Sequence, residues 1–494
     1  MQLVNEWTDL AGKLKYRNQL FIDGKFVDAL SGKSLDAISP IDQRKLCAIS
    51  AAQSEDIDVA VKSAKYAFDS GVWRDMNPRD KKALMLKWAD LVRENYKEIA
   101  LLETLEVGKP ISDTAGYDAL AVARNIQWYA ETVDKTYDEI APAPKNALAM
   151  ITREPLGVIG AIVPWNYPIV IASWKFAPAI AMGNSVVLKP SEESSLATLR
   201  IAELAIEAGI PKGVFNVVTG YGAEAGRALA LHKDVAKIAF TGSPAVGRMM
   251  LQYAAESNMK QVSLELGGKS PQVVLNDVID LDAAASTIAW GIFYNSGQTC
   301  NAGSRVIVQS KIKDALFEKL EIFVKNFRWG NPLDPQTQMG PVVSLKQRDR
   351  INSYLQQVGS NGERFVFGGK QPKDNDCNFE PTLIDAVAHD SKLAQEEIFG
   401  PVIVTEIAKD EAHALELANG TEYGLAASVW SGNISKAHNF ARKLRAGTVW
   451  VNTFDMSDVI TPFGGFKNSG SGRDKSLHAL DAYSALKTTW VDLS

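Results

Sequence analysis

The chain has 494 residues, more than one hydrophobic core usually supports, so we expect two or three domains. With 46% hydrophobic and 22% charged residues it has the composition of an ordinary globular α/β protein, which excludes collagen-like, disordered and disulfide-stapled classes. A net charge of −5 without runs of one sign argues against nucleic acid and anionic membranes as partners. Three cysteines favour a reducing compartment, so we expect a cytoplasmic protein that acts on a small molecule.

The N-terminal part of the chain predicts helices. Residues 54–69 and 80–107 each place apolar residues at three- and four-residue spacing behind a Ser or acidic start, so one helix is expected in each. The N-terminus lacks the apolar core of a signal peptide, so the mature chain is expected to begin near Met1. The most apolar segment, 158–188, is interrupted by prolines and by Lys175, and we interpret it as buried core rather than a membrane span.

A regular alternation of strands and helices starts near residue 157. It predicts a parallel sheet with right-handed crossovers and a ligand crevice at the carboxyl ends of its strands. The expected strands are 157–163, 185–191, 215–220, 235–243 and 261–275, and the expected helices are 168–182, 194–209 and 222–232. A second α/β cycle follows residue 268, with helices at 281–297 and 314–327 and strands at 304–309 and 449–452.

Two strand-like segments, 148–153 and 487–494, lie outside both cycles. Exposed strand edges of this kind commonly pair with a partner subunit. We therefore expect a homodimer or a homotetramer.

Three turns at the expected carboxyl edge offer groups for a dinucleotide, although the sequence lacks G-x-G-x-x-G. The turns at 220–226 and 241–247 place backbone N–H groups at a helix start, where the positive end of the helix dipole can hold a pyrophosphate. At the end of another strand, Lys189 could donate to ribose hydroxyls while Glu192 accepts from a 2′-OH and repels a 2′-phosphate. Taken alone, each is more often an ordinary tight turn or a solvated strand end.

Cys300 lies in a glycine- and amide-rich stretch without histidine. A thiol with its usual pKa of about 8.5 needs a base, a cation or a helix N-terminus to react at neutral pH, and none of the histidines has a recognisable active-site context. Glu265 is a charged residue in an apolar strand and a candidate base, unless it faces solvent. Asn166 could donate to an oxyanion or serve turn geometry, and Glu397 lies in a loop where function concentrates.

Motifs that occur in the expected order over nearly the whole chain resemble those of the NAD(P)-dependent aldehyde dehydrogenase family. They are PWNYP, LKPSE, FTGSPAVG, LELGGKSP, GQTCNAGSR, EEIFGP and PFGGFKNSGSGR. The resemblance implies an α/β fold with two Rossmann-type parallel-sheet domains and a small β oligomerisation element. It implies an NAD-binding domain from 1–136 and 156–267, a catalytic domain from 268–468, and oligomerisation strands at 137–155 and 480–494.

The resemblance also implies roles for individual residues. Cys300 would be the nucleophile and Glu265 the general base, while Asn166 and the Cys300 backbone N–H would form the oxyanion hole. Lys189 is expected to belong both to this catalytic set and to the cofactor site. The cofactor is expected to be NAD, with NADP as an alternative. No metal is expected. The residues expected to contact the cofactor are Ile162, Val163, Pro164, Trp165, Lys189, Glu192, Gly222, Gly226, Phe240, Thr241, Gly242, Ser243, Gly247, Leu266, Gly267, Glu397 and Phe399.

The implied reaction is the oxidation of an aldehyde. Thiolate attack gives a thiohemiacetal, hydride leaves to the nicotinamide, and water activated by the base hydrolyses the thioester to the acid. Tyr167, Trp174 and Phe463 match positions that line an aromatic tunnel in relatives.

The ending GRDKSLHAL resembles the branch that oxidises γ-glutamyl-γ-aminobutyraldehyde and other ω-aminoaldehydes from polyamine (putrescine) catabolism. In that case Asp118, Asp455 or Asp458 could meet a substrate amine, or all three could be solvated. Betaine aldehyde and a broad range of aliphatic aldehydes are alternative substrates. A cysteine hydrolase would use the same thiol without a cofactor, and a non-enzymatic relative would use neither.

Overall fold

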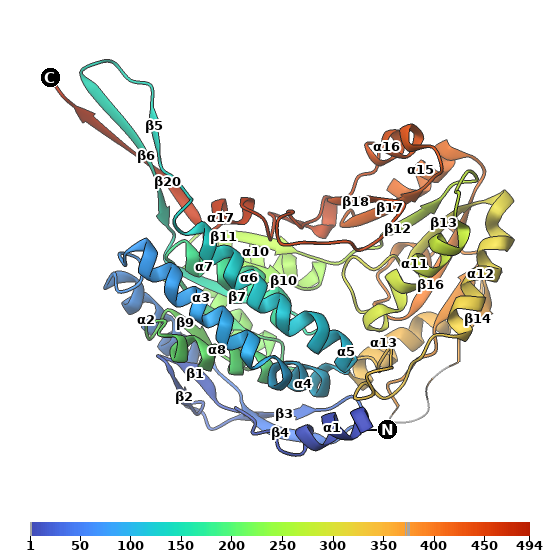
Figure 1. Ribbon diagram of the computed structural model, residues 1–494, viewed down its shortest axis with the longest axis horizontal. Coiled ribbons are helices and arrows are strands. Elements are labelled where there is room, and N and C mark those ends of the chain that lie inside the picture. Colours follow the sequence, from blue (N-terminus) through green and yellow to red (C-terminus); the bar gives the residue numbers. More distant parts are fainter. Residues whose placement is uncertain (1, 371, 373–375) are drawn as a thin grey trace.

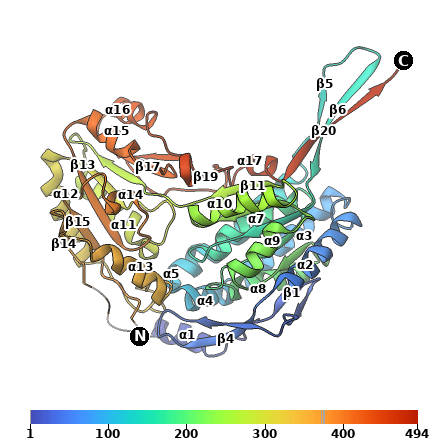
Figure 2. The ribbon, with the colours of Figure 1, turned by 180° about the vertical axis from the view of Figure 1, so that it is seen from behind.

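Two α/β halves lie side by side in the computed structural model, which describes residues 2–370, 372 and 376–494 (Figure 1). A narrow arm of antiparallel strands projects from one of the halves, and the chain ends on it (Figure 2). Each half is built around its own sheet.

The first sheet has the order β19-β11-β10-β7-β8-β9-β1-β2, in which the strands from β11 to β9 are parallel and the edge strands antiparallel. The parallel core follows from the alternation of strands and helices in the sequence. Its strands are β1 (Leu20–Ile22), β2 (Lys25–Val27), β7 (Val158–Ile162), β8 (Ser185–Lys189), β9 (Phe215–Val217), β10 (Val235–Thr241), β11 (Gln261–Glu265) and β19 (Gly470–Ser471).

Helices cover both faces of this sheet because alternate strand residues are apolar on each side. Ile159 and Val186 face one helical layer, and Val158 and Val187 face the other. The first layer is α3 (Pro78–Glu94), α4 (Tyr96–Val107), α6 (Ala119–Thr132), α7 (Pro168–Ala181) and α8 (Leu196–Ala208). The second, seen from behind in Figure 2, is α2 (Ser54–Asp69), α9 (Arg227–Leu231) and α10 (Pro244–Glu256).

The apolar segment predicted to be core forms α7 and its flanking strands, and every residue of this helix except the partly buried Trp174 is buried. Within the part of the chain that the structure describes, no helix combines the length and apolar character that crossing a bilayer needs. This half also contains the N-terminal helix α1 (Gln2–Ala11), the short helical segments α5 (Ile111–Asp113), η1 (Thr114–Asp118) and η2 (Gly222–Gly226), and a two-stranded sheet of β3 (Ser34–Ile38) and β4 (Lys45–Ser50).

The prediction of one continuous helix over 80–107 is wrong. The helix breaks at Asn95, which separates α3 from α4 with φ −97° and ψ 16°. Its side chain donates to the carbonyl of Leu91 at 2.8 Å and accepts from Arg200 of α8 at 3.0 Å. The second contact comes from a residue far along the chain, so the apolar spacing of α3 and α4 could not reveal it.

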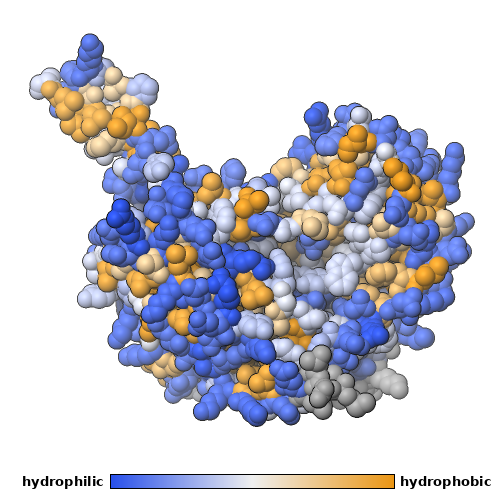
Figure 3. All heavy atoms as spheres, in the orientation of Figure 1, coloured by the Kyte–Doolittle hydropathy of each residue, from blue (hydrophilic) through white to orange (hydrophobic). Residues whose placement is uncertain are grey.

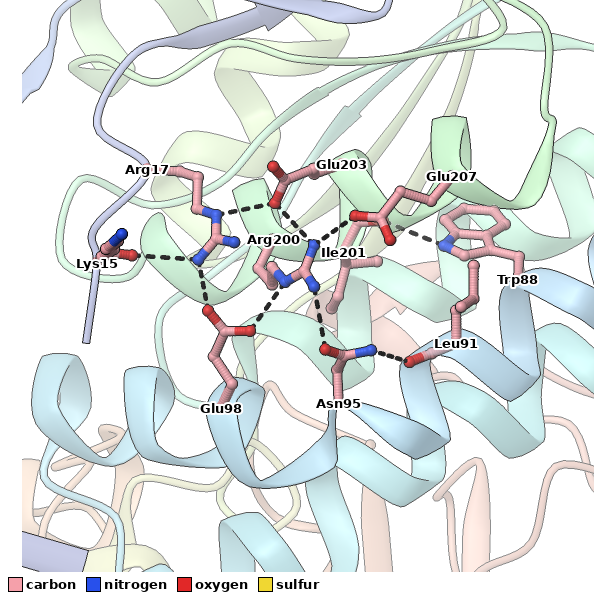
Figure 4. A network of polar contacts seen from close by, with 10 residues as sticks. All are labelled: Lys15, Arg17, Trp88, Leu91, Asn95, Glu98, Arg200, Ile201, Glu203 and Glu207. Carbon is pink, nitrogen blue, oxygen red and sulfur yellow. Dashed lines mark hydrogen bonds and ion pairs between the residues drawn. The ribbon is translucent and has the colours of Figure 1, made fainter. Parts of the chain in front are cut away.

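Asn95 belongs to a polar network that joins the N-terminal segment to α4 and α8 (Figure 4). Arg200 donates to Glu98 at 2.9 Å, to Glu203 at 2.7 Å and to Glu207 at 2.8 Å. Arg17 contacts Glu98 and, at 2.8 Å, Glu203. Two guanidinium groups therefore hold three carboxylates from two helices together.

The second sheet has the order β14-β15-β16-β13-β12-β17-β18 and is parallel except for β14. Its strands are β12 (Pro271–Val274), β13 (Arg305–Gln309), β14 (Arg364–Phe367), β15 (Thr382–Asp385), β16 (Val402–Ala408), β17 (Ala426–Trp430) and β18 (Thr448–Val451). Its helices are α11 (Leu281–Phe293), α12 (Lys313–Lys325), α13 (Leu345–Leu355), α14 (Lys392–Gln395), α15 (Glu411–Asn419) and α16 (Ile434–Ala441), with short turns η3 (Tyr294–Gly297), η4 (Ser310–Ile312) and η5 (Lys467–Ser469).

The strand region 261–275 divides between the two sheets. β11 ends the parallel part of the first sheet, β12 lies inside the second, and residues 266–270 connect them. The chain returns much later, where β19 pairs with β11. This short connection brings the carboxyl end of the first sheet next to the second half.

The arm consists of β5 (Glu139–Ala141), β6 (Ala147–Pro155) and β20 (Ser484–Asp492), and α17 (His478–Asp481) lies at its base. β6 and β20 are antiparallel along their whole length, so the two strand-like segments outside the α/β cycles pair with each other. Apolar side chains gather on the arm (Figure 3). Leu486 and Trp490 are 66% and 60% exposed there.

Candidate active site

Cys300 lies in the loop between η3 and β13, and Asn166 is hydrogen-bonded to this loop. The Asn166 side chain, 3% exposed, donates to the carbonyl of Gln298 at 2.8 Å. Asn295 donates in turn to the carbonyl of Asn166 at 3.0 Å, from a left-handed backbone conformation with φ 48°. A carboxamide has two N–H donors, so Asn166 keeps one for another acceptor beside the thiol loop.

The surroundings of Cys300 favour the thiol over the thiolate. Burial raises its pKa, and the carboxylates of Glu397, Glu265 and Asp455 raise that pKa further. The backbone N–H of Asn301 acts in the opposite direction. A reaction at this sulfur therefore requires a group that removes the proton.

Glu265 is the last residue of β11 and lies opposite Thr241 of β10. It is 5% exposed, so the alternative of an outward-facing strand residue does not hold. Within the described residues its Oε2 atom has no hydrogen-bond partner. Burial, followed by the nearby Asp474, raises its pKa well above the usual range, while Lys175 and Arg473 act against this. The raised pKa makes the deprotonated carboxylate a stronger base.

Lys175 and Asp474 form a buried ion pair near Glu265. Asp474 is fixed by two backbone hydrogen bonds of 2.8 Å with Phe463. Sequence reasoning missed this pair and treated Lys175 as an interruption of an apolar run. A buried lysine in such a run does predict an acidic partner, but the pattern gives no means of choosing which one.

The residues expected to hold a dinucleotide lie along the carboxyl edge of the first sheet. Ile162, Val163, Pro164 and Trp165 follow β7, Phe240, Thr241 and Gly242 end β10, and Ser243 is the N-cap of α10, accepting from the backbone N–H of Val246 at 3.4 Å. Gly247 lies in the first turns of α10, where a Cβ would approach Leu266 to 2.8 Å.

Lys189 and Glu192 come together at the end of β8. The Lys189 ammonium donates to the carbonyl of Pro190 at 2.8 Å and lies 3.5 Å from a Glu192 oxygen. Burial lowers the pKa of Lys189, and Glu192 opposes this effect. Gly226 packs on the same side chain, since a Cβ there would lie 3.6 Å from Lys189 Cδ, and Gly222 starts the preceding turn on the surface.

Glu397 and Phe399 reach this edge from the second half. The Glu397 carboxylate accepts from the backbone N–H of Gly268 at 3.0 Å, and a Cβ at Gly267 would come within 2.3 Å of it. Burial raises the pKa of Glu397 to about 7. The rings of Phe399 and Trp165 meet edge to face with centroids 5.2 Å apart. The two halves therefore meet where the cofactor residues were expected.

Of the aromatic residues predicted to contact the substrate, Tyr167 lies at the thiol loop, and the other two pack on each other. The Tyr167 hydroxyl is 3.0 Å from that of Thr299, the neighbour of Cys300. Trp174 and Phe463 pack with centroids 5.4 Å apart.

The three aspartates predicted to contact a substrate amine differ in their exposure and in their partners. Asp455 accepts from Asn301 at 2.7 Å, and burial raises its pKa to about 6. Asp458 is exposed. Asp118 is fully buried and ion-paired with Lys109 at 2.5 Å, so the structure does not present it to solvent. Lys109 in turn lies 3.7 Å from the centre of the Tyr167 ring, a contact the sequence did not suggest.

Comparison with known proteins identifies the family. The aldehyde dehydrogenase family model matches residues 26–489. The NADP/NAD-dependent aldehyde dehydrogenase PuuC of Escherichia coli (strain K12) is 46% identical over 99% of this chain and 98% of its own.

Two solved structures have a TM-score of 0.97 and cover 99% of this chain. They are γ-glutamyl-γ-aminobutyraldehyde dehydrogenase from Burkholderia cenocepacia J2315, 51% identical over 100% of that chain, and an indole-3-acetaldehyde dehydrogenase in complex with NAD+, 49% identical over 99% of that chain. The chain belongs to the aldehyde dehydrogenase family.

Proposed function

We propose that this protein oxidises an aldehyde to the carboxylic acid with NAD, using Cys300 as nucleophile. The observation that carries the proposal is the meeting of three groups: the Cys300 loop, the spare amide donor of Asn166 tied to that loop, and the buried carboxyl group of Glu265. A cysteine hydrolase would need a base as well, and no histidine hydrogen-bonds to Cys300 within the described residues.

The carboxyl edge of the first sheet fits a dinucleotide. The Ser243-capped N-terminus of α10 suits a pyrophosphate, and the Lys189–Glu192 pair suits a ribose with a free 2′-OH, which supports NAD over NADP. The buried Thr241 hydroxyl there lacks a partner in the described chain. NAD supplies the acceptor for the hydride that leaves the substrate carbon. We accordingly assign 1–136 and 156–267 to cofactor binding and 268–468 to catalysis.

The chain's own residues perform the acyl chemistry. The Cys300 thiol loses its proton to solvent water, and the thiolate attacks the aldehyde carbon and forms a thiohemiacetal. The free N–H of Asn166 and the Cys300 backbone N–H stabilise its oxyanion, and loss of one such donor typically costs about 100-fold in rate. Loss of hydride leaves a thioester on Cys300. Glu265 takes a proton from water, which hydrolyses the thioester and releases the acid.

The candidate substrates are ω-aminoaldehydes and γ-glutamyl-γ-aminobutyraldehyde from putrescine catabolism. Support comes from the solved relative of that name and from the carboxylates Asp455 and Asp458 near the aromatic residues. Betaine aldehyde and aliphatic aldehydes are alternatives, and the NAD+-bound relative adds indole-3-acetaldehyde. The rate of NADH formation, followed by absorbance with each aldehyde, ranks these candidate substrates. If none of them reduces NAD, the proposed function is wrong.

The catalytic assignment predicts two different variant phenotypes. Cys300→Ala should lower turnover about a thousandfold or more, because no nucleophile remains. Glu265→Gln should give a burst of NADH and then slow turnover, since the thioester forms but is not hydrolysed. Mass spectrometry detects the acyl group on the protein. Cys47→Ala is the matched control and should keep full activity; a fully active Glu265→Gln enzyme would remove Glu265 from this role.

We further propose that the arm joins subunits into a homodimer or homotetramer in the cytoplasm. Support comes from its exposed apolar side chains, including Ile140, Leu486 and Trp490, and from the free edge of β20. The three free thiols suit a reducing compartment.

A further inference from the structure

Lys475 lies against the aromatic residues proposed to contact the substrate. Its ammonium is 5.4 Å from the centre of the Trp174 ring and 5.8 Å from that of Phe463. It donates to the hydroxyl of Ser457, in the loop that also carries Asp455. The residue is only 3% exposed and has a left-handed backbone with φ 64°. The surrounding protein therefore determines the direction of its side chain.

The charge of Lys475 is not neutralised by a close partner. Asp455, Asp458 and Asp474 act on it from a distance, but no ion pair to Lys475 occurs among the described residues. Asp474 is already paired with Lys175, and Asp455 accepts from Asn301. An ammonium group has three donors, and the Ser457 hydroxyl uses one.

A buried cation with unused donors is costly unless an anion completes its surroundings. Burial lowers the pKa of Lys475 to about 8, so at neutral pH most molecules still carry the charge. No carboxylate of the described chain is in direct contact with this ammonium group, and a bound substrate can supply one.

We infer that Lys475 binds a carboxylate at the far end of the substrate, so that the enzyme prefers aldehydes that carry an α-amino acid group over simple ω-amines. This rests on the proposed function. In such a substrate the aldehyde reaches Cys300, the chain runs along Trp174 and Phe463, and the ammonium of the amino acid group faces the exposed Asp458. The γ-glutamyl group carries this combination of charges, whereas 4-aminobutanal brings only a cation, which Lys475 repels.

The test compares Lys475→Met with the wild-type enzyme on three aldehydes: γ-glutamyl-γ-aminobutyraldehyde, 4-aminobutanal and hexanal. Because a hydrogen bond to a charged group contributes a factor of roughly ten or more, KM for the γ-glutamyl aldehyde should rise about tenfold or more with little change in kcat. Hexanal kinetics should stay within about twofold, and KM for 4-aminobutanal should fall. Lys475→Arg should retain most of the γ-glutamyl preference. Lys311→Met, which removes an exposed lysine after β13, is the charge-matched control.

Binding of the unreactive amide γ-glutamylbutylamine, measured by calorimetry, separates recognition from turnover. Weaker binding to Lys475→Met but not to Lys311→Met is the expected result. If Lys475→Met binds the amide as wild type does, or loses activity equally on hexanal, the inference is overturned while the proposed function stands. If the wild-type enzyme oxidises none of the three aldehydes, the proposed function itself fails.

Discussion

Glu265 shows how a single residue can be prepared for proton transfer by its surroundings. Burial is the largest influence on its pKa and the nearby Asp474 the next, and both favour the protonated form. A general base works only when deprotonated. Thioester hydrolysis should therefore accelerate as pH rises through the pKa of Glu265.

Asp474→Asn should move this dependence to lower pH. The substitution removes the negative charge that raises the pKa of Glu265, and it leaves the Lys175 ammonium without its partner, which lowers that pKa further. The pKa therefore falls, and the acid limb of the profile of kcat against pH shifts in the acid direction. Steady-state kcat measured from about pH 6 to 9 checks this. Asp492→Asn, at the exposed end of β20, is the control; a shift toward alkaline pH would contradict the argument.

The sequence was informative about residues whose chemistry is visible locally. Cys300, Glu265 and Asn166 stand out because a thiol, a charge in an apolar strand and an amide after a strand are each unusual in their own segment. Lys175 and Asp474 are 299 positions apart, so only the fold reveals that they meet. Their pairing places a cation and a carboxylate near Glu265, and neither belongs to the strand that carries Glu265.

At the scale of elements, the local sequence patterns predicted those helices and strands that are determined by local interactions. The helix at Ser54–Asp69 has the predicted bounds, and the parallel strands from β7 to β11 follow the predicted order of strands and helices. The break at Asn95 was not predicted, whereas the division of 261–275 between two sheets falls at the boundary expected near residue 268. Both depend on distant partners, Arg200 in one case and the second sheet in the other.

Arg200→Met should destabilise the packing of α4 on α8. The substitution leaves the carboxylates of Glu98, Glu203 and Glu207 close together with one cation fewer (Figure 4). We expect the free energy of unfolding to fall by about 1–3 kcal/mol, the range for losing charged hydrogen bonds at a partly buried site. Urea denaturation followed by circular dichroism measures this. Lys62→Met, which breaks an exposed ion pair on α2, should change stability by no more than about 0.5 kcal/mol, and equal losses would argue against the network.

At the scale of the whole molecule, the arm is the part whose stability depends most on a partner. Its strands expose apolar side chains on a thin layer that projects beyond the helix at its base (Figures 1 and 3). The double substitution Leu486→Lys with Trp490→Lys should therefore reduce the mass in solution toward that of the 53.8 kDa chain, as light scattering would record. Ile279→Lys, at an exposed apolar residue away from the arm, is the control. An unchanged mass for the double variant would place the subunit contact elsewhere.

The connection at 266–270 sets the spacing between the base and the nucleophile. It starts after Glu265 and ends before β12, and on the way Gly268 lies so near the Cys300 backbone that a Cβ would come within 2.6 Å of its carbonyl oxygen. Gly267 is crowded in the same way by Glu397. Lengthening or shortening this segment by one residue would change the separation of the reacting groups.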